Sequence, residues 1–148
     1  MSLPQNTSNS RRILLVEDDS DSLEVTRRLL ERDGHVVATA TCLKTAIDSA
    51  GAGFDVLIAD IGLPDGTGID LIEHLKTSGP VKGIALSGYG MRADVESCRA
   101  AGFMEHLTKP IKFEDLRSAI DRVCASVIVR PPANGNGNGG AGATADGA

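Results

Sequence analysis

The chain has 148 residues and a net charge of −5, with 41% hydrophobic and 24% charged residues, so it has room for one globular domain. It contains no basic stripe of the kind that binds nucleic acid, and no apolar run approaches the roughly 18 residues of a membrane span. The first ten residues also lack the charged and apolar regions of a secretory signal, so we expect a cytoplasmic protein that contacts neither nucleic acid nor membrane.

The two ends of the chain differ in composition from its middle. Residues 1–10 carry no charge and are rich in serine, asparagine and threonine, while residues 130–148 are rich in glycine, asparagine and alanine. Segments of this kind cannot bury enough apolar surface to offset the entropy lost on ordering. The sequence therefore predicts a disordered segment over 1–10, one folded domain over 11–129, and a flexible tail or linker over 130–148.

Five short apolar runs recur along the predicted domain. The first four are continuous rather than alternating, which is typical of strands covered on both faces in a parallel sheet. The runs lie at residues 13–16, 36–40, 56–59, 84–86 and 104–107.

Segments with helical features separate and follow these runs. Ser20 or Asp21 is expected to cap the first helix, and Gly34 is expected to end it. Strand and helix alternate five times, which favours a doubly wound α/β domain because parallel strands need crossover helices. The predicted helices cover residues 21–33, 42–50, 68–77, 91–101 and 112–128.

Polar side chains follow four of the five predicted strands. In a doubly wound sheet the functional cleft lies outside the carboxyl ends of the strands, so these side chains should meet in one place. They are Glu17, Asp18 and Asp19 after the first strand, Asp60 after the third, Ser87 after the fourth and Lys109 after the fifth.

These residue types form a sufficient set for phosphoryl chemistry. Neighbouring carboxylates repel one another, and Mg²⁺, which prefers oxygen ligands, would remove that repulsion. Asp18 and Asp60 can supply carboxylate ligands, and Glu17 can hold a metal-bound water. The carboxylate of Asp60 can also attack phosphorus. Lys109 and Ser87 can then engage the phosphoryl oxygens, one by its charge and the other by its hydroxyl.

Each of these signals also has an ordinary structural interpretation. Glu17 and Asp18 could cap a helix, and Asp60 could be a turn residue. Ser87 could mark a loop, and a lysine such as Lys109 could lie in solvent. All four interpretations would have to coincide at matching strand ends, and we therefore favour a functional site.

Four stretches of the sequence resemble the receiver domain of response regulators in two-component signalling. They are LLVEDD at 14–19, DVLIADIGLPDGTGIDL at 55–71, IALSGYG at 84–90 and HLTKP at 106–110. They occur in the family's order and span the predicted domain. The resemblance implies a flavodoxin-like, doubly wound five-stranded parallel sheet of order 2-1-3-4-5 with five helices, and a cis Lys109–Pro110 bond.

The resemblance also implies roles for the site residues. Asp60 would be the phosphoacceptor and would take a phosphoryl group from the phosphohistidine of a histidine kinase or a histidine phosphotransfer domain. Mg²⁺ would be held by Asp18, Asp60 and the backbone carbonyl of Gly62. Ser87 would follow the phosphoryl group and Lys109 would pair with it. Such a protein is not an enzyme in the usual sense, because it catalyses only its own phosphorylation and slow dephosphorylation.

Some positions depart from the usual family pattern. His106 stands where the family usually places an aromatic switch residue, and its charge could make the switch sensitive to pH. An ordinary half-exposed strand histidine is the alternative. Tyr89 lies where the family tunes access to the phosphoryl group. His35 and His74 show no partner in the sequence and are predicted to be surface residues.

Two other classes of function stay open. A pseudo-receiver would bind proteins with the same fold and never take up phosphate. A small-molecule hydrolase with an aspartyl-phosphate intermediate would usually carry a second aspartate two residues after the first, where this chain has Gly62. Parts of the motifs are similar to receivers fused to hybrid histidine kinases. We therefore expect a stand-alone or excised receiver, with the C-terminal module of a hybrid kinase as the favoured parent. No effector domain fits in the 18 residues after Arg130, so we expect the output to be a contact with another protein or to lie on a missing part of a longer chain.

Overall fold

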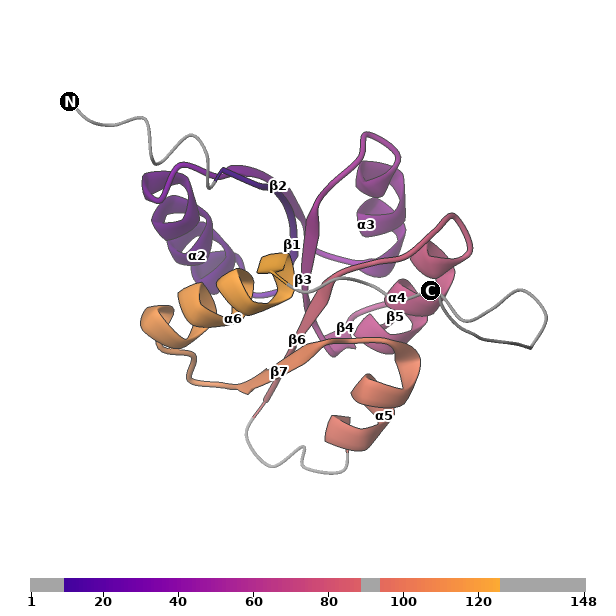
Figure 1. Cartoon of the computed structure of the whole chain (residues 1–148). Coiled ribbons are helices and arrows are strands. Elements are labelled where there is room, and N and C mark those ends of the chain that lie inside the picture. The colour runs from indigo at the N-terminus through magenta and orange to yellow at the C-terminus, as the bar shows by residue number, and fades with distance from the viewer. Residues whose placement is uncertain (1–9, 89–93, 126–148) are drawn as a thin grey trace, which may run out of the picture.

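The computed structural model of the chain describes residues 10–88 and 94–125 (Figure 1). The predicted tail, Tyr89 and all but the last residue of the predicted N-terminal segment lie outside these ranges. Within the described ranges, no helix is long and apolar enough to cross a membrane.

Five parallel strands form a central sheet in the order β2-β1-β3-β6-β7. This order is the 2-1-3-4-5 that the resemblance implied, because β6 and β7 are the fourth and fifth strands of this sheet along the chain. All five predicted strands are confirmed, with ends within one residue of the apolar runs. The strands are β1 (Arg12–Val16), β2 (Val36–Ala40), β3 (Val56–Asp60), β6 (Gly83–Ser87) and β7 (Glu105–Thr108).

In the described part of the chain, five helices cover the two faces of this sheet, as a doubly wound fold requires. Helices α2 and α6 lie on one face, and α3, α4 and α5 lie on the other (Figure 1). The predicted helices are confirmed, although residues 91–93 and 126–128 of the last two predictions lie outside the described ranges. The helices are α2 (Ser20–Arg32), α3 (Leu43–Ala50), α4 (Gly68–Lys76), α5 (Asp94–Ala101) and α6 (Phe113–Ala125).

Alternating side chains of the strands supply two buried cores, one on each side of the sheet. In β1, Leu14 and Val16 pack toward α3 and α4, whereas Ile13 and Leu15 pack toward α2 and α6. This alternation follows from the extended backbone, which points successive side chains to opposite faces. Burial of both apolar faces holds the helices against the sheet and fixes the ends of the strands.

Helix α2 is capped by a residue other than the two predicted. The N-cap is Asp19, whose Oδ2 accepts a hydrogen bond of 3.0 Å from the backbone N–H of Ser22. The prediction of Ser20 or Asp21 as the cap was wrong, because the helix begins at Ser20 and the residue before it has the extended backbone that a cap needs. Gly34 follows the helix with a φ of 96°, as the prediction of a glycine stop required.

Strand β2 lies at the edge of the sheet and is more exposed than its apolar sequence predicted. Val36 is 64% exposed, and Ala40 is the one buried residue of the strand. The expectation that this strand is covered on both faces was wrong, because it lies at the edge of the sheet, where its faces are less completely covered than those of the central strands.

His35 has a partner, contrary to the prediction. The backbone N–H of Arg11 donates a hydrogen bond of 3.0 Å to its Nδ1 atom. Close by, the hydroxyl of Ser10 donates to the carbonyl of Gly34. These bonds attach the segment that enters β1 to the turn between α2 and β2. His74, by contrast, is exposed as predicted.

A short antiparallel hairpin follows β3 and was not predicted. It consists of β4 (Gly62–Leu63) and β5 (Gly66–Thr67). Between its strands, Asp65 accepts the backbone N–H groups of Leu43 at 2.6 Å and Lys44 at 3.1 Å. The hairpin is thereby attached to the first turn of α3.

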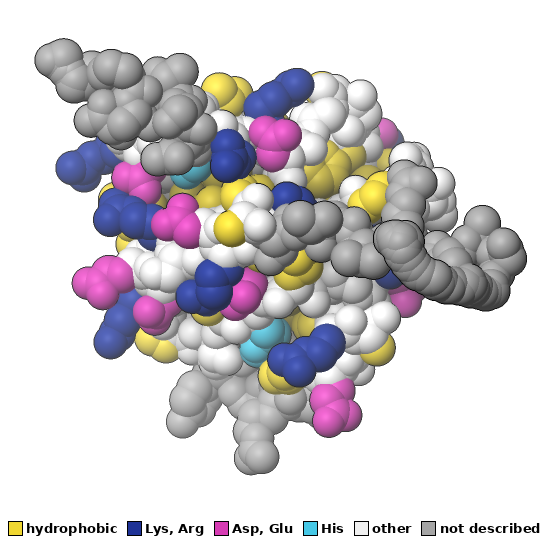
Figure 2. Space-filling view, in the orientation of Figure 1, with side chains coloured by type: hydrophobic (Ala, Val, Ile, Leu, Met, Phe, Trp, Pro, Cys, Tyr) yellow, Lys and Arg dark blue, Asp and Glu magenta, His cyan; other side chains and the backbone are white. Residues whose placement is uncertain are grey.

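Charged side chains of both signs are interspersed over the face that α2 and α6 form (Figure 2). Many of them are joined in ion pairs, and exposed pairs of this kind contribute little individually to stability. The pairs are Arg27 with Glu24 and Glu31, Arg28 with Glu24, Arg117 with Asp33, and Arg122 with Glu105.

Candidate functional site

The predicted site residues meet at the carboxyl edge of the sheet. In the strand register Val16 lies beside Ala59, so Glu17 follows one strand where Asp60 ends the next. Asp60 in turn lies beside Leu86, which directly precedes Ser87. The sheet itself therefore brings these residues to the same edge.

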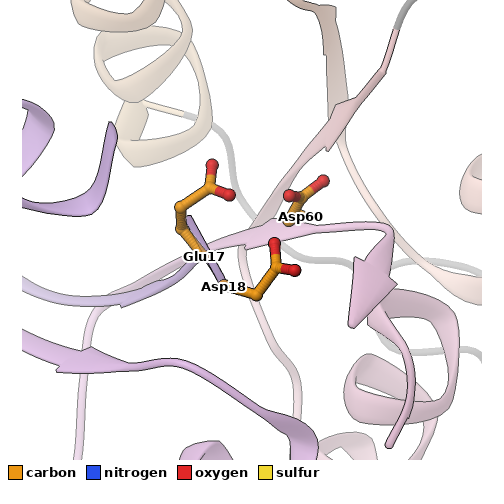
Figure 3. A group of neighbouring side chains, drawn as sticks. All are labelled: Glu17, Asp18 and Asp60. Atoms are coloured by element: carbon orange, nitrogen blue, oxygen red, sulfur yellow. The ribbon is translucent and has the colours of Figure 1, made fainter. Parts of the chain in front are cut away.

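Three carboxylates converge at this edge. Glu17, Asp18 and Asp60 each offer an oxygen, and these oxygens lie within 4.8 Å of one another (Figure 3). Glu17 and Asp60 are buried, at 4% and 7% exposure, whereas Asp18 is open to solvent. A cluster of hard oxygen ligands with one open side is able to hold a metal ion.

Lys109 joins two of the carboxylates. Its Nζ donates to Oε1 of Glu17 at 2.7 Å and to Oδ2 of Asp60 at 2.9 Å. Its backbone N–H donates to the carbonyl of Ser87 at 2.8 Å, which fixes the start of the loop after β7. The ammonium group is thus anchored between β1 and β3, although it belongs to the far edge of the sheet.

Burial and charge act in opposite directions on these groups. Burial disfavours the charged form of Lys109, but its hydrogen bonds to Glu17 and Asp60 outweigh this and hold the pKa of Lys109 above its ordinary value. Burial raises the pKa of Glu17, and the nearby carboxylate of Asp60 adds to that rise. Three carboxylates and one ammonium group thus lie in the cluster, a composition that favours a further cation.

Neither Glu17 nor Asp18 is the N-cap of α2, which was the alternative interpretation of these two residues. Asp19 caps α2, and its own backbone N–H donates to Oε2 of Glu17 at 3.1 Å. Glu17 is therefore oriented by the start of the helix without serving as its cap, and Asp18 lies beside it in the carboxylate cluster.

Ser87 is bonded to the histidine at the predicted switch position. Its Oγ lies 2.8 Å from Nε2 of His106, and the serine is 1% exposed. His106 lies beside Ala85 in the register of β6 and β7, so it is diagonal to Ser87 on the same face of the sheet. The two predicted switch residues are therefore in direct contact, which the sequence did not predict.

The loop after Asp60 contains two glycines with opposite surroundings. Gly62 is exposed, and a Cβ added there would meet no heavy atom within 4 Å. A Cβ on Gly68 would lie 2.6 Å from the backbone oxygen of Asp60. Gly68 thus lets α4 begin directly against the end of β3, where Thr67 and Asp70 form a capping box.

Gly68 and Asp65 have positional roles that were missed in the sequence. The sequence shows how many residues separate Asp60 from the Gly-Thr-Gly stretch at 66–68. It does not show that the backbone at Gly68 lies against the backbone of Asp60. The predicted cis bond before Pro110 is confirmed.

Comparison with known proteins identifies relatives of this chain. The family model described as the response regulator receiver domain matches residues 13–121. The KDP operon transcriptional regulatory protein KdpE of Escherichia coli is 33% identical over 109 residues, which are 73% of this chain and 48% of that protein. An uncharacterized 14.6 kDa protein of Leptolyngbya boryana is 29% identical over 116 residues, which are 76% of this chain and 88% of that protein.

Solved structures agree with the fold. A response regulator receiver domain protein from Clostridium thermocellum is 30% identical with a TM-score of 0.72, over 76% of this chain and 92% of that one. The non-phosphorylated HemR receiver domain from Leptospira biflexa is 27% identical with a TM-score of 0.72, over 80% of this chain and 98% of that one. The chain spans about half the length of curated regulators such as KdpE and the Bacillus subtilis protein YrkP.

Proposed function

The chain belongs to the response regulator receiver domain family of two-component signalling, and from this premise we propose that Asp60 is its phosphoacceptor. The observation that carries the proposal is the position of the Asp60 carboxylate, which is buried at the end of β3 among two further carboxylates and the ammonium of Lys109. A nucleophile, a cation and an oxygen-rich site for a metal are the parts that phosphoryl transfer needs.

In the proposed reaction an oxygen of Asp60 attacks the phosphorus of a phosphohistidine on a histidine kinase or a phosphotransfer domain. The new P–O bond forms as the P–N bond breaks, and the electron pair returns to the imidazole nitrogen, which takes up a proton. Lys109 then pairs with a phosphoryl oxygen, and the hydroxyl of Ser87 donates a hydrogen bond to another. Positioning and neutralisation of charge account for most of what the protein contributes.

The donor set suits Mg²⁺. Asp18 and Asp60 would bind the ion through carboxylate oxygens, the backbone carbonyl of Gly62 would add a third ligand, and Glu17 would hold a metal-bound water. When bound, the ion would neutralise negative charge on the phosphoryl oxygens.

The proposed cycle ends with the loss of the phosphoryl group from Asp60. The phosphoaspartate is lost when water attacks phosphorus, the P–O bond to Asp60 breaks, and the carboxylate and inorganic phosphate are released. We propose that the output is a protein contact controlled by phosphorylation, made by a stand-alone receiver or by the receiver of a hybrid histidine kinase.

The first prediction tests the phosphoacceptor directly. With Mg²⁺ and acetyl phosphate, the chain should gain one phosphoryl group, measured as an increase in intact mass, and removal of Mg²⁺ by a chelator should prevent the gain. Asp60→Asn should abolish it, because an amide oxygen is a far weaker nucleophile toward phosphorus than a carboxylate. Asp48→Asn, on an exposed carboxylate of α3, is the matched control and should behave as the wild type.

Phosphoryl uptake that persists in Asp60→Asn would show that another residue is the acceptor. A wild-type chain that folds but gains no mass, with acetyl phosphate or with a phosphorylated histidine kinase, would instead support a pseudo-receiver.

A further inference from the structure

The hydrogen bond between Ser87 and His106 has a chemical consequence for the phosphoryl site. Strand β6 lies between β3 and β7, so Ser87 has the strand of Asp60 on one side and the strand of His106 on the other. Its hydroxyl is buried and 2.8 Å from Nε2 of His106. In this structure the hydroxyl is therefore engaged on the side away from the phosphoacceptor.

A serine hydroxyl has one proton to donate and two lone pairs to accept with. If Nε2 of His106 carries no proton, Ser87 donates to it and has none left for a phosphoryl oxygen. If Nε2 carries a proton, His106 donates, Ser87 accepts, and the hydroxyl proton can point to the phosphoryl group. The same contact thus either competes with the phosphoryl group or supports it, depending on which nitrogen of the imidazole is protonated.

We propose that His106 is a positioning residue that acts through Ser87: its Nε2–H directs the hydroxyl proton of Ser87 to the phosphoryl group on Asp60. The inference rests on the proposed function and adds a role for the imidazole. Phosphorylation of Asp60 then selects the form of His106 that is protonated at Nε2. An apolar aromatic side chain at this position could fill the same space but could not set the direction of the hydroxyl.

The test compares two replacements of His106 in the full chain. His106→Gln retains a side-chain amide whose N–H can reach Ser87, whereas His106→Leu keeps a bulky side chain and removes every donor. With acetyl phosphate and Mg²⁺, His106→Leu should slow phosphorylation about two- to tenfold, the effect of one hydrogen bond of ordinary strength. His106→Gln should retain most of the wild-type rate. Equal rates for the two variants, whether both slow or both unchanged, would overturn the proposal.

A double-mutant cycle shows whether His106 acts through the serine. In a Ser87→Ala background, His106→Leu should have no further effect on the rate, because the hydroxyl that it would orient is gone. A loss of the same size in both backgrounds would mean that His106 acts by another route. Urea unfolding of each variant shows whether it is folded under the conditions of the assay.

A spectroscopic readout tests the imidazole itself. In the protein labelled with ¹⁵N-histidine, the shifts of His106 should show a protonated Nε2 once Asp60 is phosphorylated. The same addition to Asp60→Asn should leave them unchanged. A phosphorylated protein in which Nε2 of His106 stays unprotonated would contradict the inference. That result leaves the proposed function intact, because the proposed function fails only if the wild-type chain takes up no phosphoryl group.

Discussion

At the scale of single residues, His35 shows how a side chain outside the carboxylate cluster can link stability to pH. Its Nδ1 accepts the backbone N–H of Arg11, and burial holds the pKa of His35 below its ordinary value. The nearby carboxylates of Asp33 and Asp121 favour its charged form and the cation of Arg11 opposes it, but burial has the largest effect.

The sign of the expected pH effect follows from this lowered pKa. The unfolded chain binds the proton more tightly than the folded one, so the contribution of His35 is complete above its ordinary pKa of 6.5. It is lost as the pH falls from there through the folded-state pKa. We expect the urea concentration at the midpoint of unfolding to decrease as the pH is lowered from about 7.5 to about 5.5. The decrease should be smaller in His35→Asn, whose amide oxygen accepts the hydrogen bond without titrating. His74→Asn, at an exposed position, is the control, and identical slopes for His35→Asn and the wild type would refute the expectation.

At Gly68, the backbone at the start of α4 lies close to the backbone at the end of β3. A methyl group there would lie 2.6 Å from the backbone oxygen of Asp60 and 3.3 Å from Cα of Ile61, so the end of β3 would have to move. We expect Gly68→Ala to lower the free energy of unfolding by about 1–3 kcal/mol, as overpacked sites do, and to slow phosphorylation of Asp60. Both are measurable by urea unfolding and by intact mass against time.

Gly51→Ala is the matched control for this change. Its added methyl group would meet only the backbone oxygen of Asp48, at an ordinary 3.4 Å. It shares with Gly68→Ala the loss of unfolded-chain entropy that favours alanine over glycine. Equal stability and equal phosphorylation rates in the two variants would mean that the contact with Asp60 has no cost.

The residues that converge at the site were predictable because each follows an apolar run. In a parallel sheet the ends of such runs share one edge, so Asp60, Ser87 and Lys109 could be grouped without coordinates. The bond from Ser87 to His106 and the bond from Arg11 to His35 were not predictable in this way. Each joins residues 19 or 24 positions apart, and periodicity carries no information about such pairs.

At the scale of elements, the β4–β5 hairpin connects the loop after Asp60 to α3. The N-cap of α3, Cys42, makes no side-chain capping bond, and the first N–H groups of the helix are bound instead by Asp65. These bonds lower the pKa of Asp65 because they favour its charged form. The first N–H groups of α3 therefore find their hydrogen-bond acceptor in the hairpin and not in the N-cap of the helix.

Removal of this contact should loosen both elements together. In Asp65→Ala we expect faster hydrogen exchange at the amides of Leu43 and Lys44 and a lower urea midpoint, because these N–H groups lose their acceptor. Asp48→Ala, which removes only the exposed ion pair with Lys44, should leave both measurements near wild type. Unchanged exchange at Leu43 and Lys44 in Asp65→Ala would show that the hairpin does not hold α3.

The main strands and helices were predictable because each repeats its pattern over several residues. The strands of the hairpin have two residues each, which is too short for any period to show. The exposure of β2 was missed for a different reason. A run of small apolar residues is compatible with burial, but an edge position is set by the strand order of the whole sheet.

At the scale of the whole molecule, the two donors of the site belong to the same half of the fold. Lys109 follows β7 and reaches across to Glu17 and Asp60, while Ser87 ends β6 and is bonded to His106 on β7. A phosphoryl group on Asp60 would compete with the carboxylates of Glu17 and Asp60 for Lys109, and it would accept the hydroxyl proton of Ser87. This rearrangement of hydrogen bonds would affect β6, β7 and the helices α5 and α6 that pack beside them.

We therefore expect phosphorylation to repack the face made by β6, β7, α5 and α6. Amide shifts in a ¹⁵N correlation spectrum should change most in these elements when acetyl phosphate and Mg²⁺ are added, and least in β2 and the far end of α3. Addition of Mg²⁺ alone to the wild-type chain separates the effect of phosphorylation from that of ion binding, because Asp60→Asn would change a proposed ligand of the ion. Changes confined to the residues around Asp60, or equally large in β2, would show that the signal does not travel through Ser87 and Lys109. The partner that reads the signal would then have to contact the edge of the site itself.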